Sequence, residues 1–313
     1  MSSPSPSVRP LSGPATPAPW VVAGAPRSRE LLTRLVAWPA VVLSHRDLVV
    51  TSVRRELAAR FRGTLLGALW QLAQPLLLFA VYGFVFTKLL GVRLGADPDA
   101  LPGTMAVYMF SGVLVWSALS DALTRAAGSV LEQRNLVQKV RFPAQLLPLH
   151  ASLAALAPFV AGLVAFSLLA PLAGLWEAPG WRLVVLGPLL LGAQLLLTTG
   201  LGLGLAALQV LFRDTLPLLT IALTVGMFAT PIFWVPDPAI VPGIERWLPL
   251  VEWNPLAQLV GAWRALLLSL EPGQLGVAEV GTALLHSWAW GLAAFGLGSW
   301  LFFRVERHLA DEV

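Results

Sequence analysis

Six long stretches of this sequence contain no Asp, Glu, Lys or Arg residue. They span residues 63–87, 100–120, 142–176, 183–212, 215–236 and 280–303. A helix needs roughly 20 mostly apolar residues to cross the hydrocarbon core of a bilayer, and every stretch reaches that length. Leucine, alanine and glycine dominate these stretches, as membrane helices tolerate. The sequence therefore predicts an all-α polytopic membrane protein with six transmembrane helices.

The composition of the chain excludes several classes of protein. Hydrophobic residues make up 57% of the 313 positions and charged residues 12%, with a mean hydropathy of +0.74. Soluble domains carry about a quarter charged residues, so this chain cannot cover a water-soluble surface. The absence of cysteine excludes disulfides, zinc–thiolate sites and iron–sulfur clusters. A net charge of only +4 indicates a membrane surface and no nucleic-acid partner.

The positive charges predict the orientation of the spans. Six spans place both termini on one side of the membrane, and we expect that side to be cytoplasmic. Only five of the 21 Lys and Arg residues would then lie outside, namely Lys88, Arg93, Arg182, Arg246 and Arg264. We divide the chain into a disordered Pro-rich cytoplasmic tail (1–30), an interfacial amphipathic segment (31–62), a six-span membrane domain (63–303) and a cytoplasmic C-terminal tail (304–313).

The interfacial segment contains an apolar stripe. Residues 35–45 are too short to span, are interrupted by Pro39, and are expected to lie along the interface. In residues 46–62 the stripe is formed by Val50, Val53, Leu57 and Phe61. The remaining surface carries Arg54, Arg55, Glu56, Arg60 and Arg62. This pattern predicts an amphipathic helix on an anionic leaflet; a solvated helix with a chance stripe is the alternative.

We find no catalytic or metal-binding motif in the sequence. No lysine follows the glycine pattern of a phosphate-binding P-loop. Gly200, Gly202 and Gly204 lie inside an apolar stretch, where the 200/204 spacing favours close helix packing over nucleotide binding. The four histidines, His45, His150, His286 and His308, have no second ligand at metal spacing. His150 and His286 lie in or near spans and are expected to be packed and hydrogen-bonded, with a proton relay as the alternative. Ion-coupled transporters usually need ionisable groups within their spans, so any pumping would be driven by a separate ATP-hydrolysing subunit.

Several local motifs occur in the order found in one transporter family. Residues 55–70 (RELAARFRGTLLGALW), followed by Gln74-Pro75, resemble the start of polysaccharide-exporting ABC transporter permeases, which export O-antigen, capsule or teichoic-acid polymers. The further matches are 135–137 (NLV), 139–143 (KVRFP), 212–214 (FRD), 230–234 (TPIFW) and 254–256 (NPL). The resemblance covers roughly residues 45–303 and leaves the Pro-rich tail unexplained.

This resemblance implies an architecture and a set of partners. It implies a homodimer of six-span permeases in the bacterial inner membrane, with two copies of a cytoplasmic nucleotide-binding ATPase subunit on separate chains. A lipid-linked polysaccharide would pass along the dimer interface. The chain itself would be no enzyme and hold no cofactor or metal, while ATP and Mg²⁺ would bind to the partner subunit.

The segment 121–145 is expected to be the longest cytoplasmic loop and to dock on the ATPase through a short amphipathic helix. The residues that the resemblance assigns to this coupling are Asn135, Leu136, Val137, Lys139, Arg141 and Phe142. Arg213 and Asp214 offer a second contact. The alternatives are a surface-lying connector for the loop and a local ion pair for Arg213-Asp214.

The outer loop, residues 237–279, is apolar and contains several tryptophans and prolines. We expect two short re-entrant helices there, which the bilayer tolerates only where protein covers their ends. The resemblance implies a periplasmic gate formed by Trp247, Trp253, Asn254 and Pro255. A static platform anchored by tryptophans is the alternative.

Aromatic side chains are candidates for the substrate path, because a sugar ring can lie flat on an aromatic face. The candidates are Phe79, Tyr82, Phe86, Tyr108, Trp116, Phe228, Phe233 and Trp234. For each of them, packing or anchoring at the membrane interface is the alternative.

Three other functions compete with polysaccharide export. The first is a permease of the same architecture that expels small molecules or lipids. The second is a membrane-embedded glycosyl- or acyltransferase using Asp121, His150 and Asp214, which form no recognisable motif. The third is a passive channel.

Overall fold

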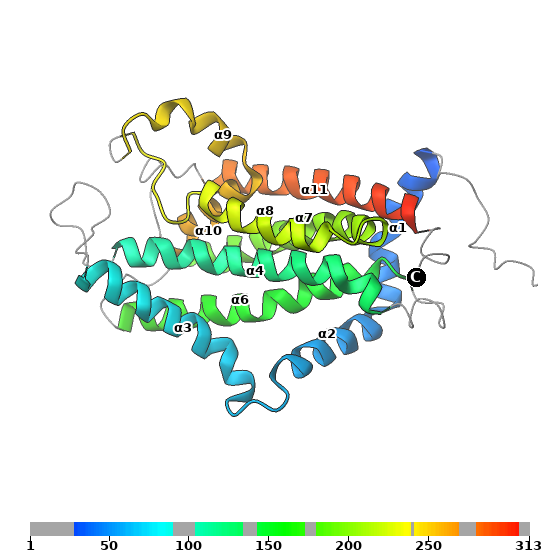
Figure 1. Cartoon of the computed structure of the whole chain (residues 1–313), viewed down its shortest axis with the longest axis horizontal. Helices are drawn as coiled ribbons and strands as arrows, with labels where there is room; N and C mark the ends of the chain where they lie inside the picture. Colours follow the sequence, from blue (N-terminus) through cyan, green and yellow to red (C-terminus); the bar gives the residue numbers. More distant parts are fainter. Residues whose placement is uncertain are drawn as a thin grey trace, which may run out of the picture.

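The chain forms a bundle of helices. A computed structural model describes residues 28–89, 104–133, 143–172, 180–238, 241–268 and 280–306. All regular secondary structure in these ranges is helical, which confirms the predicted all-α class for the described chain. Four long helices run along the same axis in Figure 1: α4 (Thr104–Glu132), α6 (Leu146–Leu172), α7 (Trp181–Leu211) and α11 (Val280–Val305).

Four helices of the described chain are long and apolar enough to cross a membrane: Met105–Glu132, Leu146–Leu168, Trp181–Leu211 and Val280–Val305. The first and fifth predicted spans are shorter than expected. They correspond to α3 (Trp70–Tyr82), continued by a π-helical segment (Gly83–Leu89), and to α8 (Thr215–Ala229). At 1.5 Å per residue α8 is about 22 Å long, less than the ~30 Å of hydrocarbon. The count of six spans stays a prediction.

Two predicted boundaries are wrong, for local reasons. Helix α8 ends at Ala229 and not at 236, because Thr230 precedes a proline and adopts an extended conformation (φ −88°, ψ 138°). Helix α4 continues to Glu132, so no loop begins at Asp121. The continuation is held by its apolar side, where Ala127 and Val130 are fully buried.

Helices α7 and α11 pack closely through glycines. A Cβ atom placed on Gly200 would lie 2.5 Å from the carbonyl carbon of Ala294, and one on Gly298 would lie 2.8 Å from the carbonyl carbon of Gly200. Gly204 lies against Gly298, whereas Gly202 faces Ala126 of α4. The prediction that the glycine run serves helix packing is confirmed.

Helix α1 (Ser28–Ser44) lies against α11 and continues through the exposed Pro39, so the predicted interruption is absent. Trp38 is buried and packs edge-on against Phe295, with ring centroids 5.1 Å apart. Arg34 also forms an ion pair with Glu306 (3.0 Å). These contacts place α1 on the bundle, and the expected course of residues 35–45 along the membrane interface stays a prediction.

Helix α2 (Arg46–Phe61) and helix α3 form a V whose tip points away from the bundle (Figure 1). Gly63 and Gly67 in the tip have positive φ angles of 77° and 53°, which glycine adopts without strain. Leu65, between them, is fully exposed. The tip therefore joins two helices that each contact the bundle along their length.

Two short helices, α9 (Leu248–Trp253) and α10 (Pro255–Leu267), occupy the predicted outer loop. Helix α10 packs against α4, α7 and α11, while α9 stands out from the bundle at the same end (Figure 1). The two short helices match the expectation, and their re-entrant course stays a prediction.

Candidate functional site

A group of ionisable side chains, which we call the ionic cluster, holds α2 on the bundle. It consists of Glu56 and Arg60 of α2, Asp121 and Arg125 of α4, and His150 of α6. Arg60 bonds to Asp121, and Arg125 pairs with Asp121 at 2.8 Å and with Glu56 at 3.5 Å. Glu56 Oε2 lies 3.3 Å from His150 Nε2. Helix α2 is thus joined to two bundle helices through charges.

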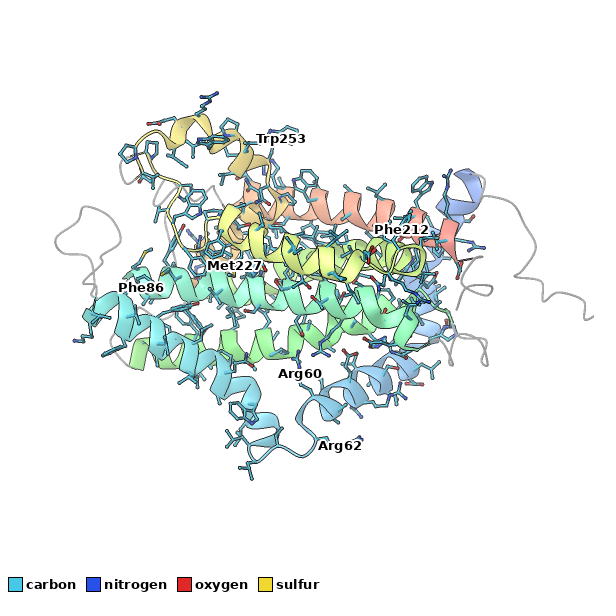
Figure 2. All side chains as sticks on the ribbon, in the orientation of Figure 1. Arg60, Arg62, Phe86, Phe212, Met227 and Trp253 are labelled. Carbon is cyan, nitrogen blue, oxygen red and sulfur yellow. The ribbon has the colours of Figure 1, made fainter. Side chains whose placement is uncertain are left out.

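Part of the charged surface of α2 contacts the bundle, and the predicted position of this helix on an anionic leaflet stays a prediction. Val50, expected in the apolar stripe, is 47% exposed, whereas its neighbour Val49 is buried. Glu56 pairs with Arg125 of the bundle. Arg60 likewise faces the bundle and pairs with Asp121 (Figure 2). The reason is that their partners lie on the unpredicted continuation of α4.

The other predicted residues of α2 lie outside the ionic cluster. Arg54, Arg55 and Arg62 are exposed, and the Phe61 side chain is outside the described ones. Arg55 and Arg62 line a cavity of about 440 Å³ that also contains Glu56 and Arg125. The ionic cluster is therefore bordered by exposed arginines.

The histidines are partly as expected. His150 is buried, and its Nδ1 atom lies 3.2 Å from the Leu146 carbonyl oxygen. His45 Nδ1 similarly lies 2.9 Å from the Val41 carbonyl oxygen. His286 is exposed, so the expectation that it is packed is wrong. His308 is outside the described residues.

The predicted coupling residues are only partly described. Asn135, Leu136, Val137, Lys139, Arg141 and Phe142 lie outside the described residues. Arg213 and Asp214 are exposed in the turn between α7 and α8. Gln209 holds this turn: its side-chain nitrogen donates to the Arg213 carbonyl (3.3 Å), and its oxygen accepts from the Leu216 amide (2.9 Å). Within this described turn the side chains of Arg213 and Asp214 form no ion pair, so both are available to a partner.

A buried arginine lies at the other end of α4. Arg264 of α10 is only 2% exposed, and its guanidinium lies over the Tyr108 ring, 3.5 Å from the centroid. It donates to the carbonyl oxygens of Tyr108 (3.1 and 3.2 Å), Ile232 (3.2 Å) and Pro231. Gly112 makes room for it, since a Cβ there would lie 2.5 Å from Arg264 Nη2. Four donated bonds thus hold the charge, and no carboxylate of the described residues forms an ion pair with it.

The sequence analysis placed Arg264 among the outer-loop charges and missed its role. The available signal was its position as the single charged residue in residues 256–270, an apolar stretch. A charge in such a place must find polar partners. Which carbonyls these would be depends on the turn at 230–234, which only the folded chain brings to α10.

Further polar contacts anchor α10 to the bundle. Trp263 Nε1 donates to Gln194 Oε1 of α7 (2.8 Å), with both residues fully buried. Asn254 is the N-cap of α10: its side chain accepts from the Leu256 amide (2.9 Å) and donates to Thr230 Oγ1 (3.3 Å). Pro255 follows at the first helical position, as is typical. The two sequence motifs at 230–234 and 254–256 therefore contact each other.

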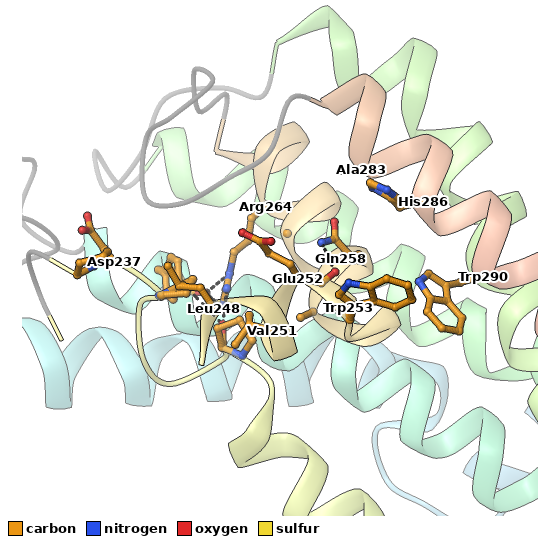
Figure 3. Close-up of a pocket in the computed structure, with 16 residues that line it drawn as sticks. Asp237, Leu248, Val251, Glu252, Trp253, Gln258, Arg264, Ala283, His286 and Trp290 are labelled. Atoms are coloured by element: carbon orange, nitrogen blue, oxygen red, sulfur yellow. Dashed lines mark hydrogen bonds between the residues drawn. The ribbon is translucent and has the colours of Figure 1, made fainter. Parts of the chain in front are cut away.

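Helix α9 contrasts with α10. Trp247 is 55% exposed and Trp253 is 74% exposed, and no residue of α9 is buried. A cavity of about 890 Å³ lies between α9, α10 and α11 (Figure 3). Of the four predicted gate residues, Trp253 lines this cavity, and Asn254 and Pro255 begin the anchored helix α10.

The candidate path aromatics fall into two groups. Tyr108 and Trp116 are buried, and Phe79 packs against Phe110 and Phe166 with centroids 4.9 and 5.6 Å away. The second group is exposed or partly exposed and consists of Tyr82, Phe86, Phe228, Phe233 and Trp234. Pairs form within it, between Tyr82 and Phe86 (6.1 Å) and between Phe228 and Phe233 (5.6 Å). Of the candidates, Phe228 is the most exposed, at 61%.

The fold and these sites define a helical, multi-pass membrane protein. At one end the ionic cluster holds α2 on the bundle, and at the other end polar contacts hold the short helix α10. Residues 47–268 match the family described as ABC-2 type transporter, and the chain belongs to that family. The resemblance noted in the sequence is confirmed at the level of the family.

Curated relatives give the same assignment. The chain is 35% identical over 222 residues to an O-antigen export system permease protein, RfbA, of Myxococcus xanthus, a match covering 71% of this chain and 80% of that protein. It is 24% identical over 230 residues to a protein of the same name from Klebsiella pneumoniae, covering 71% of this chain and 81% of that one.

Proposed function

We propose that this chain is the membrane-spanning permease subunit of an ABC transporter that exports a lipid-linked, O-antigen-like polysaccharide across the bacterial inner membrane. The observation that carries the proposal is the 35% identity with an O-antigen export permease over 71% of the chain. The match to the ABC-2 type transporter family over residues 47–268 supports it. In this topology both termini are cytoplasmic, as the distribution of positive charges indicates.

The energy for export comes from ATP hydrolysis in a separate nucleotide-binding subunit. The sequence contains no P-loop motif, so ATP and Mg²⁺ belong to the partner and this chain performs no covalent chemistry. Two copies of the partner dock on the cytoplasmic side, at residues 135–142 and at the exposed turn with Arg213 and Asp214.

The permease acts as a homodimer, and two exposed apolar stripes support this arrangement. On α3 and its π-helical continuation the stripe consists of Leu77, Val81 and Phe84, which are 46–65% exposed. On α8 it consists of Leu218, Ile221, Val225 and Phe228, which are 61–63% exposed. A second copy packed on α3 and α8 would place the exposed aromatic group beside the dimer interface, where the polymer passes.

The ionic cluster of α2 and the polar contacts of α10 suggest how the substrate path opens. Helix α10 is fixed by the contacts of Arg264, Trp263 and Asn254, so the outer gate moves through α9, which has no buried residue. On the cytoplasmic side the ionic cluster holds α2 on α4 and α6. When the charged groups of this cluster change partners, α2 moves together with the docked ATPase.

Reconstituted vesicles test the proposal. With the partner ATPase, ATP and a lipid-linked glycan, glycan should cross the membrane only when ATP is hydrolysed. ATP turnover without glycan movement would refute the export function. Deletion of the chain in cells should also remove the surface polysaccharide, whereas a permease for drugs or small lipids would leave it intact.

A further inference from the structure

The cavity between α9, α10 and α11 has the size and composition of a ligand site. Its volume of about 890 Å³ lies within the range of small-molecule sites, roughly 300–1,000 Å³. Trp253 at the end of α9 and Trp290 of α11 line it together with Glu252, Gln258 and His286 (Figure 3). We propose that this cavity binds an uncharged sugar unit of the polymer as it leaves the membrane, an inference that rests on the proposed export function.

Aromatic surface is the first argument for a sugar. Trp253 is 74% exposed and Trp290 is partly exposed, so both indoles offer surface to a ligand. Indole faces bind the apolar face of a sugar ring by contact alone, without fixed hydrogen-bond positions. His286 and Trp290 lie four residues apart on α11 and therefore share one side of that helix.

Polar groups at the cavity are the second argument. Gln258 Nε2 donates to the Glu252 carbonyl oxygen (2.8 Å), which leaves the Gln258 side-chain oxygen as an acceptor. The carboxylate of Glu252 forms no ion pair with any described residue and is exposed. Carboxylate and amide oxygens accept hydrogen bonds from sugar hydroxyl groups. Polar groups around two indoles match a sugar better than a lipid acyl chain.

The charge of the cavity excludes an anionic group such as a phosphate. Among the described residues that line it, the acids are Asp237 and Glu252, and the permanent cation is Arg264. The guanidinium of Arg264 is already engaged with the carbonyl oxygens of Tyr108, Pro231 and Ile232. A phosphate would meet the exposed Glu252 carboxylate without a free arginine to compensate, whereas a neutral sugar meets hydrogen-bond acceptors.

Binding of glycan fragments to the purified permease–ATPase complex in lipid nanodiscs tests the inference. The probes are uncharged oligosaccharides released by mild acid from the surface polysaccharide of the source cells. Their binding is detected by saturation-transfer NMR and its affinity is measured by titration. Trp253→Ala should weaken binding about tenfold, which corresponds to about 1.4 kcal/mol. Glu252→Gln should weaken it less, because the amide oxygen still accepts.

The matched control is Trp181→Ala. Trp181 is 72% exposed at the start of α7 and does not line the cavity, so its removal should leave binding unchanged. No fragment binding to the wild-type complex, or equal losses in both tryptophan variants, would overturn the inference. Neither result touches the proposed function, which fails only if the wild-type complex moves no glycan across vesicles.

Discussion

Replacing the buried Arg264 by methionine should lower the free energy of unfolding more than replacing an exposed arginine by methionine. Methionine keeps an unbranched apolar stem but donates no hydrogen bond. The Ile232 carbonyl oxygen would then lose its donor. Those of Tyr108 and Pro231 would lose their charge-assisted bonds but keep bonds from the hydroxyl groups of Ser111 and Tyr108. An unsatisfied buried polar group costs about 1–3 kcal/mol, and each hydrogen bond to a charged group contributes about 1.5–3 kcal/mol. One unsatisfied carbonyl oxygen together with the lost bonds to the other two therefore costs at least about 3 kcal/mol. We adopt this lower end, because removing the guanidinium also removes the cost of burying its charge.

The assay is thermal melting of the purified protein. The folded fraction that remains after heating to each temperature is measured by size-exclusion chromatography. A loss of 1 kcal/mol lowers Tm by about 2–4 °C in domains of comparable size, so Arg264→Met should melt at least about 6 °C below wild type. Arg246→Met is the control, because Arg246 is exposed and such a change costs less than about 0.5 kcal/mol. Arg264→Lys should fall between them, since an ammonium cannot reproduce the planar fork. Equal melting of Arg264→Met and Arg246→Met would refute the reasoning.

Three further predictions follow from the other contacts. Gly298→Ala should lower Tm, because its Cβ would meet the Gly200 backbone, whereas Gly296→Ala on the same helix meets nothing within 4 Å and should be neutral or stabilising in the same melt. Arg60→Asp and Asp121→Arg should each reduce ATP-driven glycan export in vesicles, and the double variant should recover part of it. An additive double variant would contradict a direct contact. Asn254→Ala should cost about 1 kcal/mol through loss of the α10 N-cap, detectable by melting, and Asn254→Asp should retain most of it.

Much of the fold can be predicted from local sequence. The uncharged stretches match α6, α7 and α11 closely, because a charged side chain in hydrocarbon is too unfavourable to be scattered along a span. Gly200 and Gly204 indicated helix packing because only small residues at this spacing allow two backbones to approach. The ordered motifs were sufficient to place the chain in its family.

The tertiary structure decided where the charges go. Asp121 and Arg125 suggest a loop when read alone, yet they lie within α4, whose apolar side is buried in the bundle. Their partners Arg60 and Glu56 come from α2, 60 or more residues away in the sequence. Arg264 is tolerated inside the protein because α4 and the turn at 230–234 present carbonyl oxygens to it. Hydrophobic patterning is local and can be read along the chain, whereas the partner of a charge is chosen by which segments the fold brings together.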